Sequence, residues 1–404
     1  MNFTVTVPPN AQNHGDPGLL CLPPIWTDYF IFFATNYFAH AATLISQPGE
    51  SLMETLISTA NALFIPGSGA LRAFRFLVLY ISPLISGPRR ADRLEQAARA
   101  DALCMVVKEK DVNTVTKMKG TLELLFGEDI RTVPTTRAIH GVCRLPHPDP
   151  DPEFPRFRLI EVPPTMPLRD YDPRAEAHNM DPDIDNQELT PIDMQLAKSY
   201  NIPKILISIL QIAWGIITLY KARGDQIALY GYGAFSLTVA PYAIMSLINL
   251  ATNLLRPEYA TMYLVHTTDL TLASDQSGEF AGIVASVDIT EFDEKHFAGT
   301  LSPTIFFAIN LVGYFIICIL PIALVGGFTG FGTGSNINIA ISWVLGWLIV
   351  GSVSALWVRV SATFWLHAIW EVLLVFPLWI PAIGGLVVVA QMLKDFGICT
   401  ESNS

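Results

Sequence analysis

Six long apolar stretches limit how this 404-residue chain can fold. A helix needs about 20 apolar residues to cross a bilayer, and each stretch is close to that length or longer. The stretches are residues 29–46, 203–220, 227–255, 303–325, 339–358 and 372–393. Hydrocarbon offers no hydrogen-bond partners, so a chain inside it folds into helices that pair their own backbone groups. The sequence therefore predicts an α-helical polytopic membrane bundle.

A further apolar region, residues 51–86, does not fit the same pattern. It contains Glu54, Arg72 and Arg75, and Pro66-Gly67 interrupts it. Because proline is poorly accommodated inside a helix, we interpret the region as two short helices that lie in the membrane interface or re-enter the membrane. If the region instead spans the membrane, the number of transmembrane helices rises from six to seven and the N-terminus changes side.

The few charged residues indicate where the chain leaves the membrane. They make up 15% of the chain, against about 25% in soluble proteins. Of the 25 Lys and Arg residues, 16 lie between Arg89 and Lys198. This composition excludes an ordinary soluble enzyme, a disordered protein and a nucleic-acid-binding protein. Because basic loops stay in the cytosol, we expect the larger soluble segments to be cytosolic and, with six spans, both termini to be extracytosolic.

These features divide the chain into alternating membrane and water-exposed parts. Residues 1–24 form an extracytosolic N-terminal segment, and residues 25–87 contain the first span and the interfacial or re-entrant helices. Residues 88–202 and 256–302 are two cytosolic segments, on either side of a transmembrane hairpin at residues 203–255. Residues 303–393 contain three spans and are followed by a C-terminal tail at residues 394–404.

The two cytosolic segments carry signals for both helices and strands. Apolar residues recur at helical spacing over residues 90–110. Short runs typical of strands occur at residues 133–145, 157–162, 261–265 and 282–288. Between them, residues 170–193 are so acidic that they are typical of a loop or disorder. Because both segments lie on the same side of the membrane, we expect them to pair into one small α+β cytosolic cap.

Several blocks of the sequence carry a resemblance to a known group of proteins. They are Cys21-Leu22-Pro23-Pro24, Pro48-Gly49-Glu50, Ile139-His140-Gly141 and residues 36–43, 91–107 and 226–242. Together these blocks resemble multi-pass integral membrane proteins predicted from the genomes of filamentous fungi. The resemblance implies a eukaryotic plasma membrane or endomembrane. It implies no activity and no catalytic residues, so candidate sites rest on the residues themselves.

Asn36 and His40 are the first candidate site residues. They are four residues apart, so both project from one face of the first predicted span. Polar side chains inside a membrane are costly unless they face protein or water. The pair is therefore either a functional site, as a proton relay, ligand contact or metal ligand, or an interhelical hydrogen bond that holds the bundle together.

His367 and Glu371 repeat this spacing just before the last predicted span. A carboxylate beside an imidazole favours the charged ring, and the two together could relay a proton or bind a divalent metal. With His40 they would make a three-ligand set, although the sequence does not show that these helices touch. Anchoring at the membrane interface, beside Trp365 and Trp370, is the simpler explanation of the pair. We therefore predict no metal and no cofactor.

Charged and sulfur-containing side chains suggest two further contacts. Arg72 and Arg75 are candidate contacts for anionic lipid headgroups, although ordinary cytosolic anchoring also explains them. Glu54 could pair with one of them across the Pro66-Gly67 break. Cys21 and Cys399 would share an oxidising compartment if both termini are extracytosolic, which makes them a candidate disulfide.

Three functional hypotheses follow. The first is a non-enzymatic membrane protein that binds, senses or moves a small molecule or lipid in its helix bundle, with a cap open to cytosolic protein partners. The second is an intramembrane enzyme with a His/Glu site, and the third is a membrane scaffold that recruits cytosolic proteins. Because the sequence contains no G-x-S-x-G and no H-E-x-x-H motif, we favour the first. We expect the lipid bilayer, and no nucleic acid, as a partner.

Overall fold

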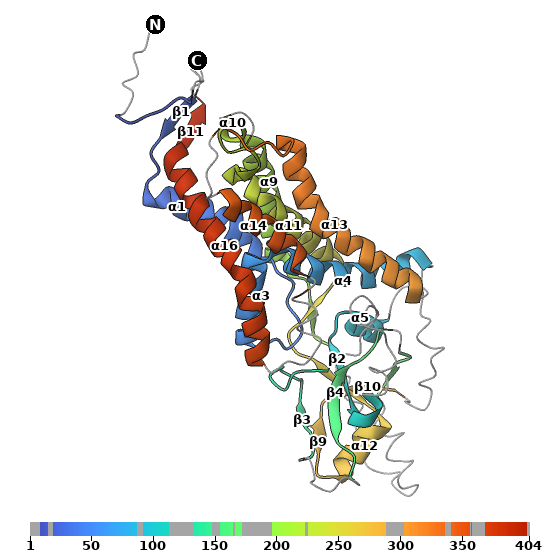
Figure 1. The fold of residues 1–404 in the computed structure, drawn as a ribbon. Coiled ribbons are helices and arrows are strands. Elements are labelled where there is room, and N and C mark those ends of the chain that lie inside the picture. Colours follow the sequence, from blue (N-terminus) through green and yellow to red (C-terminus); the bar gives the residue numbers. More distant parts are fainter. Residues whose placement is uncertain are drawn as a thin grey trace, which may run out of the picture.

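The computed structural model describes most of the chain, and helices make up most of what it describes. The described residues are 9–14, 19–86, 92–112, 132–147, 154–164, 166–171, 196–222, 225–287, 303–335, 341–355, 357 and 368–401. A bundle of long helices occupies one part of the molecule and a small sheet domain the other (Figure 1). Both chain ends lie at the end of the bundle remote from the sheet domain (Figure 1).

The bundle is built from helices distributed along the whole chain. They are α1 (Trp26–Phe33), the π-helical turn η1 (Ala34–Phe38), α2 (Ala39–Ala42), α3 (Leu52–Phe64), α4 (Pro66–Ser86), α9 (Ile202–Lys221), α10 (Asp225–Tyr230), the 3-10 turns η2 (Gly231–Gly233) and η3 (Phe235–Val239), α11 (Ala240–Leu255), α13 (Pro303–Thr329), α14 (Ile341–Val353) and α16 (Ala368–Phe396). Close packing depends on small residues. A Cβ at Gly384 or Gly385 of α16 would lie within 2.6 Å of Trp343 or Trp347 of α14.

Four helical segments among the described residues are long and apolar enough to cross a membrane. They are Ile202–Lys221, Phe235–Leu255, Phe307–Thr329 and Val375–Phe396. The pair α3–α4 would make a fifth if it is a single broken span. Two of the six predicted stretches fold as shorter pieces: α1–η1–α2 covers only Trp26–Ala42, and α14 only Ile341–Val353. The count of six or seven spans therefore stays a prediction.

The break between α3 and α4 lies where the sequence predicts it. Ser51 and Glu54 form a capping box that starts α3, with each side chain bonded to the other residue's amide at 3.2–3.3 Å. Pro66 lacks an N–H and cannot continue that helix, but its fixed φ suits the first turn of a new one. The two helices consequently meet at an angle of 115°. This geometry is that of a broken span or a re-entrant pair.

The sheet domain draws on both segments that the sequence assigns to the cytosol. Within the described residues its largest sheet has the strand order β4-β2-β8-β10-β5. The strands are β2 (Leu103–Lys108), β4 (Phe157–Glu161), β5 (Arg169–Asp170), β8 (Tyr263–His266) and β10 (Ile283–Ser286), with helices α5 (Arg93–Arg99) and α12 (Thr268–Asp275). Smaller pairs join β3 (Val142–Arg144) to β9 (Glu279–Ala281) and β6 (Lys198–Ser199) to β7 (Glu258–Tyr259). Because β2 pairs with β8, the predicted pairing of the two segments is confirmed.

The helix predicted for residues 90–110 is wrong in its second half. Helix α5 ends at Arg99, and Asp101 then adopts a φ of 58°, which turns the chain out of the helix. Residues 103–108 are instead β2, an interior strand of the sheet that is buried on both faces. A strand covered on both faces is continuously apolar, and its residue pattern cannot be told from that of a buried helix.

A disulfide joins the two ends of the chain. Strand β1 (Leu19–Leu22) pairs antiparallel with β11 (Ile398–Glu401), and Cys21 lies directly opposite Cys399. The two sulfurs are bonded to each other. The candidate disulfide of the sequence analysis is thus present in the structure, at the end of the bundle remote from the sheet domain (Figure 1).

Candidate functional site

Buried polar side chains line the contact between the first helical segment, α9 and α11. They are Asn36, His40 and Thr43 from the first segment and its end, Gln211 and Thr218 from α9, and Ser246 and Asn249 from α11. Each is at most 8% exposed. We call this set the polar seam. Polar groups inside a helix bundle are expected to pair with each other across helices, because lipid offers no alternative partner.

His40 lies within the seam and connects all three helices. Its Nδ1 is 2.6 Å from the Ser246 hydroxyl. That hydroxyl in turn lies 3.4 Å from the Gln211 side-chain oxygen. Gly215 of α9 lies beside the imidazole, since a Cβ there would be 3.8 Å from the ring, an ordinary van der Waals distance. His40 thus faces protein rather than lipid, as a polar residue in a span is expected to do.

Asn36 uses a different neighbour from His40. Its amide oxygen accepts a hydrogen bond of 3.0 Å from Thr218 of α9, and its nitrogen donates to the Phe32 carbonyl at 2.9 Å. The π-helical turn η1 lies between α1 and α2 and includes Asn36. Such a turn adds a residue to the helix and changes which direction the following side chains take. Asn36 and His40 are therefore both buried, but their side chains form hydrogen bonds with different helices, α9 for Asn36 and α11 for His40.

The seam continues toward the sheet domain. The Asn249 side-chain nitrogen donates to the Thr43 hydroxyl at 3.3 Å, and that hydroxyl donates to the His40 carbonyl at 2.7 Å. Further along α11, Thr252 donates to the Ala73 carbonyl of α4 at 3.0 Å. Hydrogen bonds therefore join the first segment, α9, α11 and α4 in one connected set.

Three buried atoms of the seam find no hydrogen-bond partner among the described residues. They are His40 Nε2, Gln211 Nε2 and Asn249 Oδ1. The Tyr242 backbone lies near the imidazole, but Nε2 itself is left unpaired. Most buried polar atoms in proteins are paired, often by ordered water. The seam therefore has unused capacity to donate and to accept hydrogen bonds with a small polar species.

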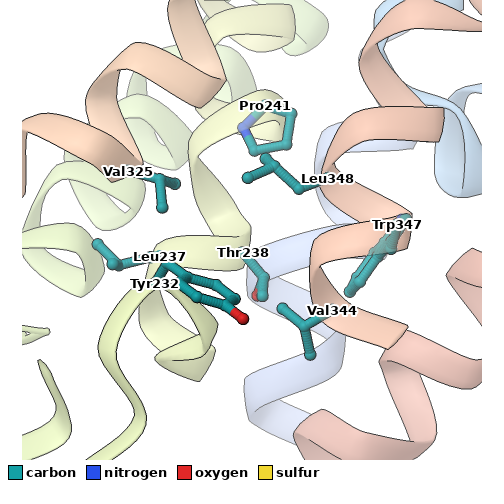
Figure 2. A pocket seen from close by; sticks show the side chains of 8 residues that line it. All are labelled: Tyr232, Leu237, Thr238, Pro241, Val325, Val344, Trp347 and Leu348. Carbon is teal, nitrogen blue, oxygen red and sulfur yellow. The ribbon is translucent and has the colours of Figure 1, made fainter. Parts of the chain in front are cut away.

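The one pocket described near the seam is narrow. Figure 2 shows its lining of Tyr232, Leu237, Thr238, Pro241, Val325, Val344, Trp347 and Leu348. It is mostly apolar and wide enough inside for about one water molecule. Thr238 lies 2.6 Å from the hydroxyl of Tyr37, the residue after Asn36, so the pocket borders the seam. This pocket is too small for a lipid.

The hydroxyl of Thr218 allows a test of how strongly the seam holds the bundle. Thr218→Val keeps the side-chain shape and removes the bond to Asn36. We expect a loss of about 0.6–1.7 kcal/mol in the free energy of unfolding, because hydrogen bonds between membrane helices are individually weak. Unfolding in detergent micelles measures this. Thr35→Val is the matched control, because Thr35 bonds only to carbonyls of its own helix at Ile31 and Phe32. Equal losses in the two variants would contradict the expectation.

Arg72 and Arg75 each form an ion pair with a carboxylate. Arg72 donates to Glu50 at 2.9 Å. Arg75 donates to both oxygens of Asp101, at 2.7 and 3.2 Å. The two arginine side chains are only 16% and 13% exposed. Both arginines therefore tie α4 to neighbouring loops, and a contact with lipid headgroups stays a prediction.

Glu54 has different partners from those predicted. It accepts a hydrogen bond of 2.6 Å from Thr136 and lies 3.9 Å from the Arg137 guanidinium. Pairing across the α3–α4 break with Arg72 is therefore wrong. The bend of 115° carries α4 away from α3, and Arg72 lies nearer the loop that precedes α3. Glu54 instead connects α3 to the sheet domain.

Arg256, at the end of α11, is a residue whose role sequence analysis missed. It is 3% exposed. Its guanidinium donates to the Ser46 carbonyl at 3.0 Å and to the Ala100 carbonyl at 2.7 Å, and it lies 4.0 Å from the centre of the Phe76 ring. It therefore joins the loop after α2, the sheet domain and α4. We call this set of contacts, with the Arg72–Glu50 and Arg75–Asp101 ion pairs, the junction. The signal available in the sequence was an arginine directly after a span.

The stability of the junction depends on pH through the carboxyl group of Glu50. Burial by itself would raise the pKa of this carboxyl, but Arg72, the Gln47 amide and the Ser58 hydroxyl stabilise the carboxylate and together lower its pKa below the ordinary 4.5. Since the folded-state pKa is the lower one, the stabilisation is complete above about pH 4.5 and is lost as the pH falls through the folded-state value.

We expect the free energy of unfolding to fall in that acid range for the wild type. Glu50→Gln should be less stable at neutral pH and should change less with acidification, because it has no carboxylate to protonate. Unfolding curves recorded from neutral to acid pH measure both effects. Parallel pH dependences of the two proteins would contradict this expectation.

The structure does not describe the side chains of the second predicted pair, His367 and Glu371. His367 lies outside the described residues, and Glu371 lies in α16 with its side chain outside the description. A joint site with His40 therefore stays a prediction. Comparison with protein-family models, curated proteins and solved structures found no match. The functional interpretation consequently rests on the geometry of the seam and the junction.

Proposed function

We propose that this chain is a non-enzymatic, multi-pass integral membrane protein that binds or moves a small polar species at the polar seam. The observation that carries this proposal is the set of three unpaired buried atoms, on His40, Gln211 and Asn249. Desolvating a polar group without a partner is costly. A bound species that both donates and accepts hydrogen bonds would remove that cost. The proposal includes the six-span arrangement, with the sheet domain in the cytosol.

The species that we propose is water, or a proton carried by water. The pocket that borders the seam admits about one water molecule, which fits a species of that size. His40 is the group suited to this role, because its ring nitrogens can accept and release a proton. Ser246 and Gln211 extend the path from the ring by hydrogen bonds.

The junction extends the proposal from binding to sensing. Thr43 of the seam precedes Ser46, and Ser46 contacts both Lys204, at 2.6 Å, and Arg256, at 3.0 Å. Lys204 also pairs with Glu258 of β7 at 3.0 Å. These contacts therefore connect the surroundings of His40 to the sheet domain, so a change in the hydrogen bonds of His40 could be transmitted through them. Such coupling requires two arrangements of the connected groups, each biased by the bound species.

Proton flux across a reconstituted membrane tests the proposal. The full chain is placed in lipid vesicles that contain a pH-sensitive dye, and a pH gradient is imposed. The wild type should dissipate the gradient faster than protein-free vesicles, and His40→Leu should return the rate to that of protein-free vesicles. Thr35→Val, on the same helix but outside the seam, should behave as the wild type.

Equal rates for wild-type and protein-free vesicles would contradict the proposal and favour the scaffold hypothesis. A specific observation already supports that alternative. The buried ion pair between Arg75 of α4 and Asp101, with the hydrogen bond from Arg256 to the Ala100 carbonyl, ties the sheet domain to the bundle, as a platform for cytosolic partners requires. The intramembrane-enzyme hypothesis gains no comparable support from the described residues, since the described part of His40's surroundings contains hydroxyl and amide partners.

A further inference from the structure

Three side chains with metal-binding atoms meet where the two ends of the chain come together. They are His14, Cys21 and Cys399, and one donor atom from each lies within 4.8 Å of the others. Cys21 is 2% exposed. The two cysteines are bonded to each other as a disulfide. His14 comes from the segment before β1, which is tied to that strand by two backbone hydrogen bonds between Gln12 and Cys21, at 2.9 and 2.8 Å.

The imidazole of His14 is held in one orientation and one tautomer. Its ring stacks on Phe396 with a centroid distance of 4.2 Å and an interplanar angle of 7°. Its Nε2 lies 2.8 Å from the Phe396 carbonyl oxygen, which can only accept, so Nε2 carries the proton. The neutral ring therefore keeps its lone pair on Nδ1. Metal-binding histidines characteristically donate their other N–H to a backbone carbonyl in this way.

The backbone at His14 supports the same interpretation. Its φ of 44° lies in the left-handed region, which is uncommon for a residue other than glycine. Residues held in such conformations require surrounding contacts that fix them. Here the stacking and the hydrogen bond to Phe396 supply those contacts. The side chain is consequently placed beside the two sulfurs before any ligand is present.

We propose that, when the disulfide is reduced, His14, Cys21 and Cys399 bind one Zn²⁺ ion. Two thiolates and one imidazole form a recognised zinc ligand set that leaves a fourth position for water. Donor atoms around a tetrahedral Zn²⁺, with Zn–S distances of about 2.3 Å, lie a little under 4 Å apart. The three donors are already within 4.8 Å of one another. Breaking the S–S bond lets the sulfurs separate by the remaining amount.

A dithiol can serve as the reductant that converts the disulfide into the metal-binding thiols. The dithiol gives two electrons and two protons to the Cys21–Cys399 disulfide and is itself oxidised to a disulfide. The two cysteine thiols then bind Zn²⁺ as thiolates and release two protons to solvent. Because the same sulfurs form the disulfide or hold the metal, the two states exclude each other. The ends of the chain are thus joined either by a covalent bond or by a metal ion.

Metal titration of the full-length protein in detergent micelles tests the proposal. The protein is compared oxidised and after reduction with a phosphine, which forms its oxide with oxygen from water. Zn²⁺ uptake is measured by equilibrium dialysis, and Co²⁺ is used as a spectroscopic probe of thiolate coordination. The reduced wild type should bind one more equivalent of metal than the oxidised protein, with a thiolate-to-cobalt charge-transfer band. His14→Ala should weaken binding by at least about tenfold, since even outer-sphere partners of a ligand are worth that much.

Cys143→Ser is the matched control. Burial raises the pKa of the Cys143 thiol to about 11, so this cysteine is protonated at neutral pH and is a poor ligand. Its removal should leave the metal uptake of the reduced protein unchanged. The proposal is overturned if reduction adds no metal binding. It is equally overturned if His14→Ala binds as tightly as the wild type, because two thiols alone would then explain the uptake.

Discussion

Asp101→Ala is expected to lower the free energy of unfolding by about 3–5 kcal/mol, because it leaves buried arginines without their carboxylate. The Asp101 side chain is 3% exposed and accepts two hydrogen bonds from Arg75, at 2.7 and 3.2 Å. It also supplies negative charge to the buried Arg256. One substitution therefore removes the charge that balances two guanidinium groups at the junction.

Asp101→Asn separates charge from shape at the same position. Asparagine tolerates the φ of 58° observed there, as aspartate does, and keeps one oxygen that can accept from Arg75. We expect a loss smaller than that of alanine but still measurable. Denaturant unfolding of the purified protein in micelles, followed by circular dichroism, gives both values.

The exposed ion pair between Arg144 and Glu279 provides the control. Its side chains are 74% and 60% exposed, so Glu279→Gln should cost less than about 1 kcal/mol. If Asp101→Ala cost no more than Glu279→Gln, the junction would not be held by its buried ion pairs. The coupling step of the proposed sensing route would then lose its physical basis.

Loss of the Cys21–Cys399 disulfide is expected to be the second large effect. The bond closes a loop with a sequence separation of 378 residues. A cross-link over a long loop restricts the unfolded chain strongly, and removing a native one costs on the order of 2–5 kcal/mol. The double variant Cys21→Ser/Cys399→Ser should therefore melt at a lower temperature than the wild type.

Thermal unfolding with a phosphine reductant and a metal chelator measures this effect without interference from metal binding. The reductant should lower the Tm of the wild type and of Cys143→Ser, and it should leave the double variant unchanged. Cys143 and Cys104 lie outside the disulfide and are not expected to respond. A wild-type Tm that is insensitive to reductant would mean that the paired strands β1 and β11 hold the chain ends without the covalent bond.

Particular residues show how far the sequence could predict the candidate site. The apolar setting of Asn36 and His40 was sufficient to predict that both face protein or water, and the structure shows both buried in protein. The spacing of four was not sufficient to predict their partners, because Asn36 lies in the π-helical turn η1 and His40 follows it in α2. Likewise Pro66 predicted the break between α3 and α4, but not the angle that sends Arg72 to Glu50 instead of Glu54.

The sequence by itself determined the properties that depend on neighbouring residues. The length and polarity of each apolar stretch predict membrane-spanning helices, because each helix satisfies its own backbone and is solvated by lipid along its length. Only the tertiary structure decided which helices touch. His40 and Ser246 are 206 residues apart, and Arg256 and Ser46 are 210 apart. Such contacts depend on how separate helices pack, and many arrangements bury the same apolar surface equally well. The seam and the junction follow from that packing, because a polar side chain acquires its chemistry from the partners that packing brings to it.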